Sequence, residues 1–144
     1  MRVGIDATYL LTPRKSGVET YTLNLVRELL ALPGAPETFL YAAAPHGVPE
    51  DAAPLLGVAA RARVSRVPRL WLRLLMPLWM RWDRVQVAHF PGTLLPTWLP
   101  CPAVVTFYDM ASQRYPELYS PAEQRIYETL IPRAAKRAAA ILAI

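Results

Sequence analysis

Short apolar, strand-like runs alternate with helical patterns along the whole chain, and this alternation limits the folds that the chain can adopt. The runs cover residues 2–7, 38–43, 62–67, 85–90, 103–108 and 139–144. A helix that connects two parallel strands lies across one face of their sheet, so this order favours a mostly parallel sheet covered on both faces. We therefore predict an α/β fold, a three-layer Rossmann-like domain that spans residues 1–144 without an internal boundary.

The helices have clear signals at their starts. Ser16 with Glu19, and again Ser120 with Glu123, have the spacing of a capping box. Pro132 falls inside the second of these helices and removes one backbone hydrogen bond, so we expect it to kink or split that helix. Apolar residues share one face of each helix: Val18, Tyr21, Leu25, Val26, Leu29 and Leu30 in the first, and Ile126, Tyr127, Leu130, Ile131 and Ala134 in the second.

The composition argues against several classes of site. With 2 histidines, 1 cysteine and no clustered carboxylates, the chain has few ligands for a transition metal, and we expect neither a metal nor a redox cofactor. Cys101 has no partner for a disulfide, which fits a reducing compartment. A polar loop follows Asp6 where a signal peptide would need an apolar region, and prolines interrupt the uncharged stretch 85–108. These observations predict a cytoplasmic protein, at most peripheral on the inner face of the membrane.

The basic excess is local. The net charge is +5, and 7 arginines lie between residues 61 and 84, where Asp83 is the single acid. Residues 69–84 also hold tryptophans and leucines in a helical pattern that Pro77 interrupts. Such a helix can lie in a membrane interface, or it can pack its apolar residues on the sheet while the arginines face water; both interpretations stay open here. No helix-turn-helix, zinc-finger or RNP pattern supports a nucleic-acid partner.

Three polar or glycine-containing segments follow strands that can be neighbours in the sheet. If the strands have the common order 3-2-1-4-5-6, the loops after the first and fourth strands flank the crevice where the order reverses. Gly17 opens the helix after the first loop, His89 lies at the end of the fourth strand, and Tyr108 and Asp109 end the fifth. A helix N-terminus presents unpaired amides there, although neither a dinucleotide fingerprint nor a P-loop is present. We expect one cleft at this edge.

The same segments resemble family-4 glycosyltransferases of the GT-B fold. The resemblance covers GIDATYLL followed by SGVETYTLNLVREL near the start, VAHFPGTLLP at 87–96, and residues 104–144. These segments keep the order that they have in the family and make up about half of the chain. The resemblance implies that residues 1–144 are the N-terminal, acceptor-binding domain of a retaining glycosyltransferase, and that the C-terminal donor-binding domain is absent.

The resemblance also assigns roles to single residues. Gly17 and the amide of Val18 match the glycine loop that approaches the donor phosphates and the acceptor. Asp109 matches the aspartate of the family's histidine–aspartate pair, whereas Tyr108 stands where the family has the histidine. A tyrosine has a pKa of about 10 and exchanges only neutral hydrogen bonds near pH 7. Either Tyr108 shapes the acceptor pocket or His89 takes over the polar role, and His89 can equally be a structural histidine.

In the family, the nucleotide-sugar donor binds mainly to the C-terminal domain through an E-x7-E motif. No two of the 7 glutamates here are eight positions apart, and the chain stops within an apolar run. We therefore expect the natural polypeptide to continue and this domain alone to be inactive. The resemblance implies that the acceptor is a sugar or a lipid-linked molecule and that the leaving phosphate of the donor helps to deprotonate it. The alternative is a noncatalytic doubly wound domain that binds a phosphorylated ligand or a protein partner.

Overall fold

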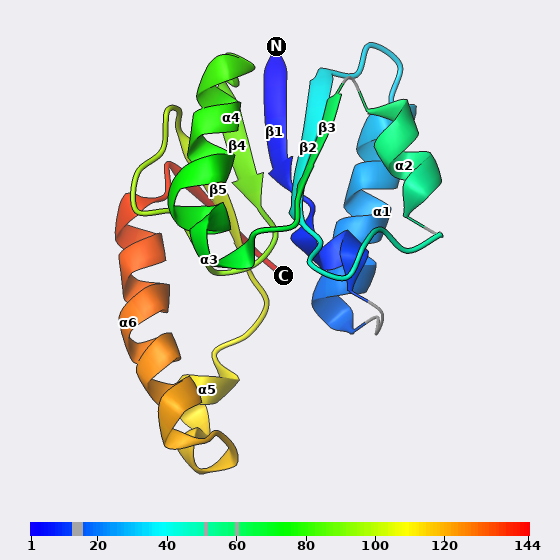
Figure 1. Ribbon diagram of the computed structural model, residues 1–144. Helices are drawn as coiled ribbons and strands as arrows, with labels where there is room; N and C mark the ends of the chain where they lie inside the picture. The colour runs from blue at the N-terminus through cyan, green and yellow to red at the C-terminus, as the bar shows by residue number, and fades with distance from the viewer. Residues whose placement is uncertain (13–15, 51, 60) are drawn as a thin grey trace.

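The computed structural model describes residues 1–12, 16–50, 52–59 and 61–144, which form one layered α/β domain (Figure 1). Its sheet has 6 parallel strands in the order β3-β2-β1-β4-β5-β6. The strands are β1 Arg2–Asp6, β2 Glu37–Ala43, β3 Arg61–Ser65, β4 Val87–Phe90, β5 Ala103–Phe107 and β6 Ala140–Ala143. The Rossmann-like fold class, all six predicted strands and the strand order are confirmed, with strand ends within two residues of the prediction.

Helices cover both faces of this sheet. One face carries α1 (Gly17–Ala31) and α2 (Ala53–Val58), and the other carries α3 (Pro68–Leu70), α4 (Met76–Trp82) and α6 (Pro121–Arg137), as Figure 1 shows. Short helices complete the chain: the 3-10 helices η1 (Thr8–Leu11) and η3 (Pro116–Leu118), the π-helical segment η2 (Trp71–Leu75), and α5 (Ala111–Arg114).

The alternation of side chains along the strands divides the core into two clusters. Val3 and Ile5 of β1 pack with Val26 of α1 on one face. Gly4, between them, faces the other side, where an added Cβ would lie 3.0 Å from Val85 and 3.1 Å from Tyr41. The second cluster joins Tyr41 and Phe90 of the sheet to buried Trp71, Met76 and Met80 of the helical stretch 68–82. Gly4 therefore leaves room for Val85 and the ring of Tyr41 on this face of the sheet.

The basic segment 69–84 is thus partly core. Trp71, Met76 and Met80 are buried, while Leu70, Leu74 and Trp82 are exposed by 50%, 42% and 66%. The helical stretch passes Pro77 without a break because η2 shifts its hydrogen bonding by one residue, with the Met76 amide donating to the carbonyl of Trp71. Of the helices in the described ranges, none is both long and apolar enough to cross a bilayer.

Both predicted capping boxes are confirmed, whereas the expected split at Pro132 is wrong. The Ser16 amide donates to Glu19 over 3.0 Å, and the Ser120 amide donates to Glu123 over 2.8 Å. Helix α6 continues through Pro132 as one element from Pro121 to Arg137. Pro132 is exposed, while its neighbours Ile131 and Ala134 are buried against the rest of the domain, so packing on both sides compensates for one missing hydrogen bond.

Candidate functional site

A cavity of about 170 Å³ lies at the carboxyl edge of the sheet. Its walls come from segments far apart in the sequence: the first turn of α1, the loop after β4, the end of β5, and α5 and α6 (Figure 1). The order of the strands reverses between β1 and β4, so the cavity adjoins the position where doubly wound sheets bind ligands. It is lined by Val18, Thr93, Phe107, Tyr108, Asp109, Ser112, Tyr119, Tyr127 and Ile131.

Helix α1 begins beside this cavity, and the space around its first residue, Gly17, is open. A Cβ built on Gly17 would meet no heavy atom within 4 Å, so folding does not require a glycine there. Val18, the next residue, lines the cavity. Burial by itself would raise the pKa of Glu19, but hydrogen bonds from Ser16 outweigh it and lower this pKa, so the carboxylate stays ionised as the helix cap. The first turn of α1, whose amides lack partners within the helix, therefore borders a cavity that a ligand could occupy.

Tyr108 presents an unsatisfied hydroxyl. Its oxygen is buried and has no hydrogen-bond partner among the described residues, although the ring lines the cavity. Its ring packs edge-to-face on Tyr21, with centroids 5.5 Å apart. Burial, with smaller contributions from Tyr21, Tyr9 and Glu19, raises the pKa of Tyr108 above its usual value. The hydroxyl therefore keeps its proton at neutral pH.

Asp109 follows directly and is exposed at the mouth of the cavity. Its Oδ1 accepts a hydrogen bond of 2.9 Å from the amide of Ala111, at the start of α5. This contact orients the carboxylate, which retains acceptor capacity for the hydroxyl groups of a ligand. Asp109 thus provides a hydrogen-bond acceptor next to Tyr108 in the wall of the cavity.

His89 does not line this cavity. It is 9% exposed, on the α1 face of the sheet, and its Nε2 shares a hydrogen bond of 2.9 Å with Thr106. Burial lowers the pKa of His89 to about 4, so the imidazole is neutral at pH 7. The Thr106 hydroxyl in turn lies 3.4 Å from that of Tyr21, the residue that packs on Tyr108. His89 is therefore linked to the cavity wall through two residues and does not reach it directly.

Several residues of the site were not predicted from the sequence. Tyr119 and Tyr127 form an edge-to-face pair with centroids 5.3 Å apart and line the wall that α6 contributes. A Cβ on Gly92, in the loop after β4, would overlap the ring of Tyr9 in η1, so Gly92 allows the loops after β1 and β4 to pack together. Tyr9 and Gly92 both lie within the segments that resemble the glycosyltransferase family, so this resemblance was the sequence signal that could have identified them. Tyr119, just before α6, and Tyr127 in α6 also lie within these segments, but their pairing in the cavity wall depends on the folded structure.

Within the described parts of the chain, no three His, Cys, Asp or Glu side chains gather closely enough to hold a metal ion. Comparisons of the chain with protein-family models, with curated proteins and with solved structures found no match.

Proposed function

We propose that residues 1–144 form the acceptor-binding domain of a retaining glycosyltransferase, one half of a GT-B enzyme that uses a nucleotide-diphosphate sugar. The observation that carries this proposal is the carboxyl-edge cavity, because Val18 of α1 shares its wall with Tyr108 and Asp109, which follow β5 directly. These are residues that the resemblance to family-4 glycosyltransferases assigns to substrate binding. A second domain, which would face this cavity, would supply most contacts to the nucleotide.

The chemistry of the cavity suits a polyhydroxyl acceptor. Phe107 and the tyrosines offer aromatic surfaces on which the C–H faces of a sugar ring can pack, while Thr93 and Ser112 add hydroxyl groups. Asp109 would accept a hydrogen bond from an acceptor hydroxyl, and Tyr108 would shape the wall of the pocket. Since Tyr108 keeps its proton, neither residue replaces the family's histidine as a base, and the leaving phosphate of the donor would take the acceptor proton.

A noncatalytic domain that binds a phosphorylated ligand or a protein partner is the second candidate. Two observations favour it: a protonated tyrosine occupies the position of the family's histidine, and His89 is buried behind the cavity wall. This candidate predicts ligand binding without sugar transfer, so activity measurements separate the two functions.

Gly17 provides a clean test, because a larger side chain there meets open space. We expect Gly17→Leu to fold normally and to weaken binding of UDP- or GDP-sugars at least tenfold, because the side chain would block the approach of the phosphates to the first turn of α1. Gly57→Leu is the matched control, since Gly57 also has open space around its Cβ but lies in α2. Binding is measured by calorimetry with UDP, GDP and their sugar conjugates.

The second measurement is nucleotide release during sugar transfer by the longest gene product that contains these residues. If Gly17→Leu abolishes sugar transfer and Gly57→Leu preserves it, the result supports the glycosyltransferase function. Binding without transfer would favour the noncatalytic domain. If Gly17→Leu bound and transferred like the wild type, the assignment of this cavity would be wrong.

We also propose a peripheral membrane contact through residues 69–84, as the sequence suggested. The exposed side chains Leu70, Leu74 and Trp82 share the outer surface of this segment with Arg73 and Arg81. We expect the chain to sediment with anionic liposomes at low salt and Leu74→Ser to reduce this fraction several-fold. Leu32→Ser, which changes an exposed leucine at the end of α1, is the matched control. Failure of the wild type to sediment would remove the membrane contact.

A further inference from the structure

A second cavity, of about 290 Å³, lies at the opposite, amino edge of the sheet. Its walls come from the starts of β1, β2 and β3 and from the residues that end α4. Because parallel strands place their starts and their ends at opposite edges, this cavity is separate from the candidate site described above. It is lined by Arg2, Glu37, Phe39, Arg61, Trp82, Asp83 and Arg84.

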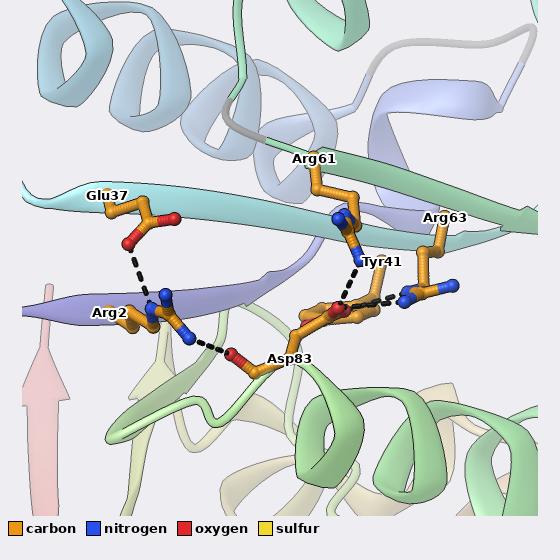
Figure 2. Close-up of polar contacts among 6 residues, drawn as sticks. All are labelled: Arg2, Glu37, Tyr41, Arg61, Arg63 and Asp83. Atoms are coloured by element: carbon orange, nitrogen blue, oxygen red, sulfur yellow. Dashed lines mark hydrogen bonds and ion pairs between the residues drawn. The ribbon is translucent and has the colours of Figure 1, made fainter.

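The acidic side chains of this cavity are already paired. Arg2 donates to Glu37 over 2.9 Å, and Arg63 binds both oxygens of Asp83 at 2.7 and 2.8 Å. The Asp83 side chain is 1% exposed and also accepts from Tyr41 over 2.8 Å, as Figure 2 shows. Burial by itself would raise the pKa of Asp83, but the hydrogen bonds from Arg63 and Tyr41 outweigh it and hold this pKa below its usual range.

Two positive charges remain after this pairing. Arg61 donates to Asp83 over 3.0 Å with Nη1 only, and its side chain is 55% exposed. Arg84 is exposed, lines the cavity, and forms no ion pair within the part of the chain that the structure describes. With Arg2 balanced by Glu37 and Arg63 balanced by Asp83, the guanidinium groups of Arg61 and Arg84 are in excess.

Arg84 has a backbone conformation that residues other than glycine rarely adopt. Its φ is 55°, in the left-handed region, and the amides of Arg84 and Val85 donate to the carbonyls of Arg81 and Met80 in the hydrogen bonds of a Schellman motif. Glycine is the usual residue at this position because it has no Cβ. The chain does use glycine at its other left-handed positions within the described residues, Gly34 and Gly47. An arginine in this conformation indicates that its side chain serves a purpose other than stability.

We propose that this cavity binds a phosphate group, with Arg84 and Arg61 as its cationic ligands and the exposed indole of Trp82 as a wall. Two guanidinium charges match a phosphate dianion, and guanidinium groups bind phosphate oxygens in pairs. The phosphate can belong to a small soluble molecule or to a lipid headgroup, since both present the same oxygens. Neither the sugar-transfer function nor the carboxyl-edge cavity is needed for this binding.

Arg84→Gly separates binding from stability. The variant loses the guanidinium group of Arg84, and glycine adopts the left-handed backbone conformation without strain. We therefore expect the melting temperature to rise by about 3 °C and the affinity for inorganic phosphate to fall at least fivefold. Arg27→Ala is the matched control, because it removes the same charge from an exposed position in α1, outside the cavity and outside residues 69–84. Calorimetric titration with inorganic phosphate forms one arm. Sedimentation with vesicles of phosphatidylcholine, with and without phosphatidic acid, forms the other.

Loss of inorganic phosphate binding in Arg84→Gly, with binding by Arg27→Ala within twofold of the wild type, would support a soluble ligand. A response to phosphatidic acid vesicles alone, lost in Arg84→Gly and kept in Arg27→Ala, would support a lipid headgroup. The proposal is overturned if the wild type responds in neither arm, or if Arg27→Ala weakens binding as much as Arg84→Gly does. A lower melting temperature for Arg84→Gly would also overturn it, by assigning Arg84 to the stability of the fold.

Discussion

Buried His89 makes the stability of this domain depend on pH, and His89→Gln should remove much of that dependence. In the folded protein the pKa of His89 is lowered to about 4 by burial, whereas an unfolded chain has a histidine pKa of about 6.5. Between these values the unfolded state binds a proton that the folded state does not. Stability is therefore lost as the pH falls from about 6.5 towards 4.

The size of this loss of stability follows from the difference between the pKa values of His89 in the folded and unfolded states. Each pKa unit corresponds to about 1.4 kcal/mol, so the free energy of unfolding should fall by about 2 kcal/mol between pH 7.5 and pH 5 through His89 alone. Over the whole range down to pH 4 the loss approaches about 3 kcal/mol. Glutamine keeps a polar group that can reach Thr106 and does not titrate, so the variant should lose about 2 kcal/mol less than the wild type over the first interval.

Urea unfolding followed by tryptophan fluorescence at pH 7.5, 6.5, 5.5 and 5.0 measures the difference between the two proteins. Other titrating groups are common to both and cancel in that difference. The matched control is His46→Gln, which removes the exposed histidine in the loop after β2. Parallel pH profiles for the wild type and His89→Gln would show that His89 is protonated as readily in the folded protein as in the unfolded chain, and would refute the reasoning.

Three further substitutions test the packing around the two cavities, each by urea unfolding at pH 7.5. Pro132→Ala should stabilise the protein by about 1–3 kcal/mol, because it restores a hydrogen bond inside the continuous helix α6; a loss of stability would contradict this. Gly92→Ala should cost about 2 kcal/mol through overlap with Tyr9, and adding Tyr9→Ala should recover part of that loss; no recovery would exclude this contact as the cause. Asp83→Asn should cost about 3 kcal/mol because it leaves Arg63 without its buried partner, and a change below about 0.5 kcal/mol would refute a structural role for this ion pair.

The sequence predicted the strands well because each is a short apolar run with clear flanking loops. Burial on both faces makes the central runs distinctive, as for the run that contains Val3 and Ile5, whereas the edge strand β6 is exposed. Of the two effects expected of Pro132, a kink or a split, the split was wrong, because a local rule cannot weigh the packing of Ile131 and Ala134 against one missing hydrogen bond. Likewise, the arginine-rich segment left two interpretations open, and the structure showed that its tryptophans divide, with Trp71 in the core and Trp82 on the surface.

The candidate site was predictable in part. Val18, Tyr108 and Asp109 line one cavity, which follows from strand order and from the position of each residue just beyond a strand or at a helix start. The place of His89 behind the wall was not predictable, because side chains alternate between the two faces of a strand and a shift of one residue reverses the face. The amino-edge cavity was also invisible, since its residues come from four separate segments.

By itself, the sequence determined the elements of this protein: which runs form strands, which residues cap the helices, and hence a parallel sheet between helical layers. These properties depend on neighbours in the chain, through hydrogen bonding and the periodicity of apolar residues. Only the tertiary structure decided which polar groups lost water and which kept it. Arg63 and Asp83 are 20 positions apart, yet they form a buried pair, whereas Arg84 stays exposed beside them. Such differences arise from desolvation and close packing between distant segments, and no local pattern encodes them.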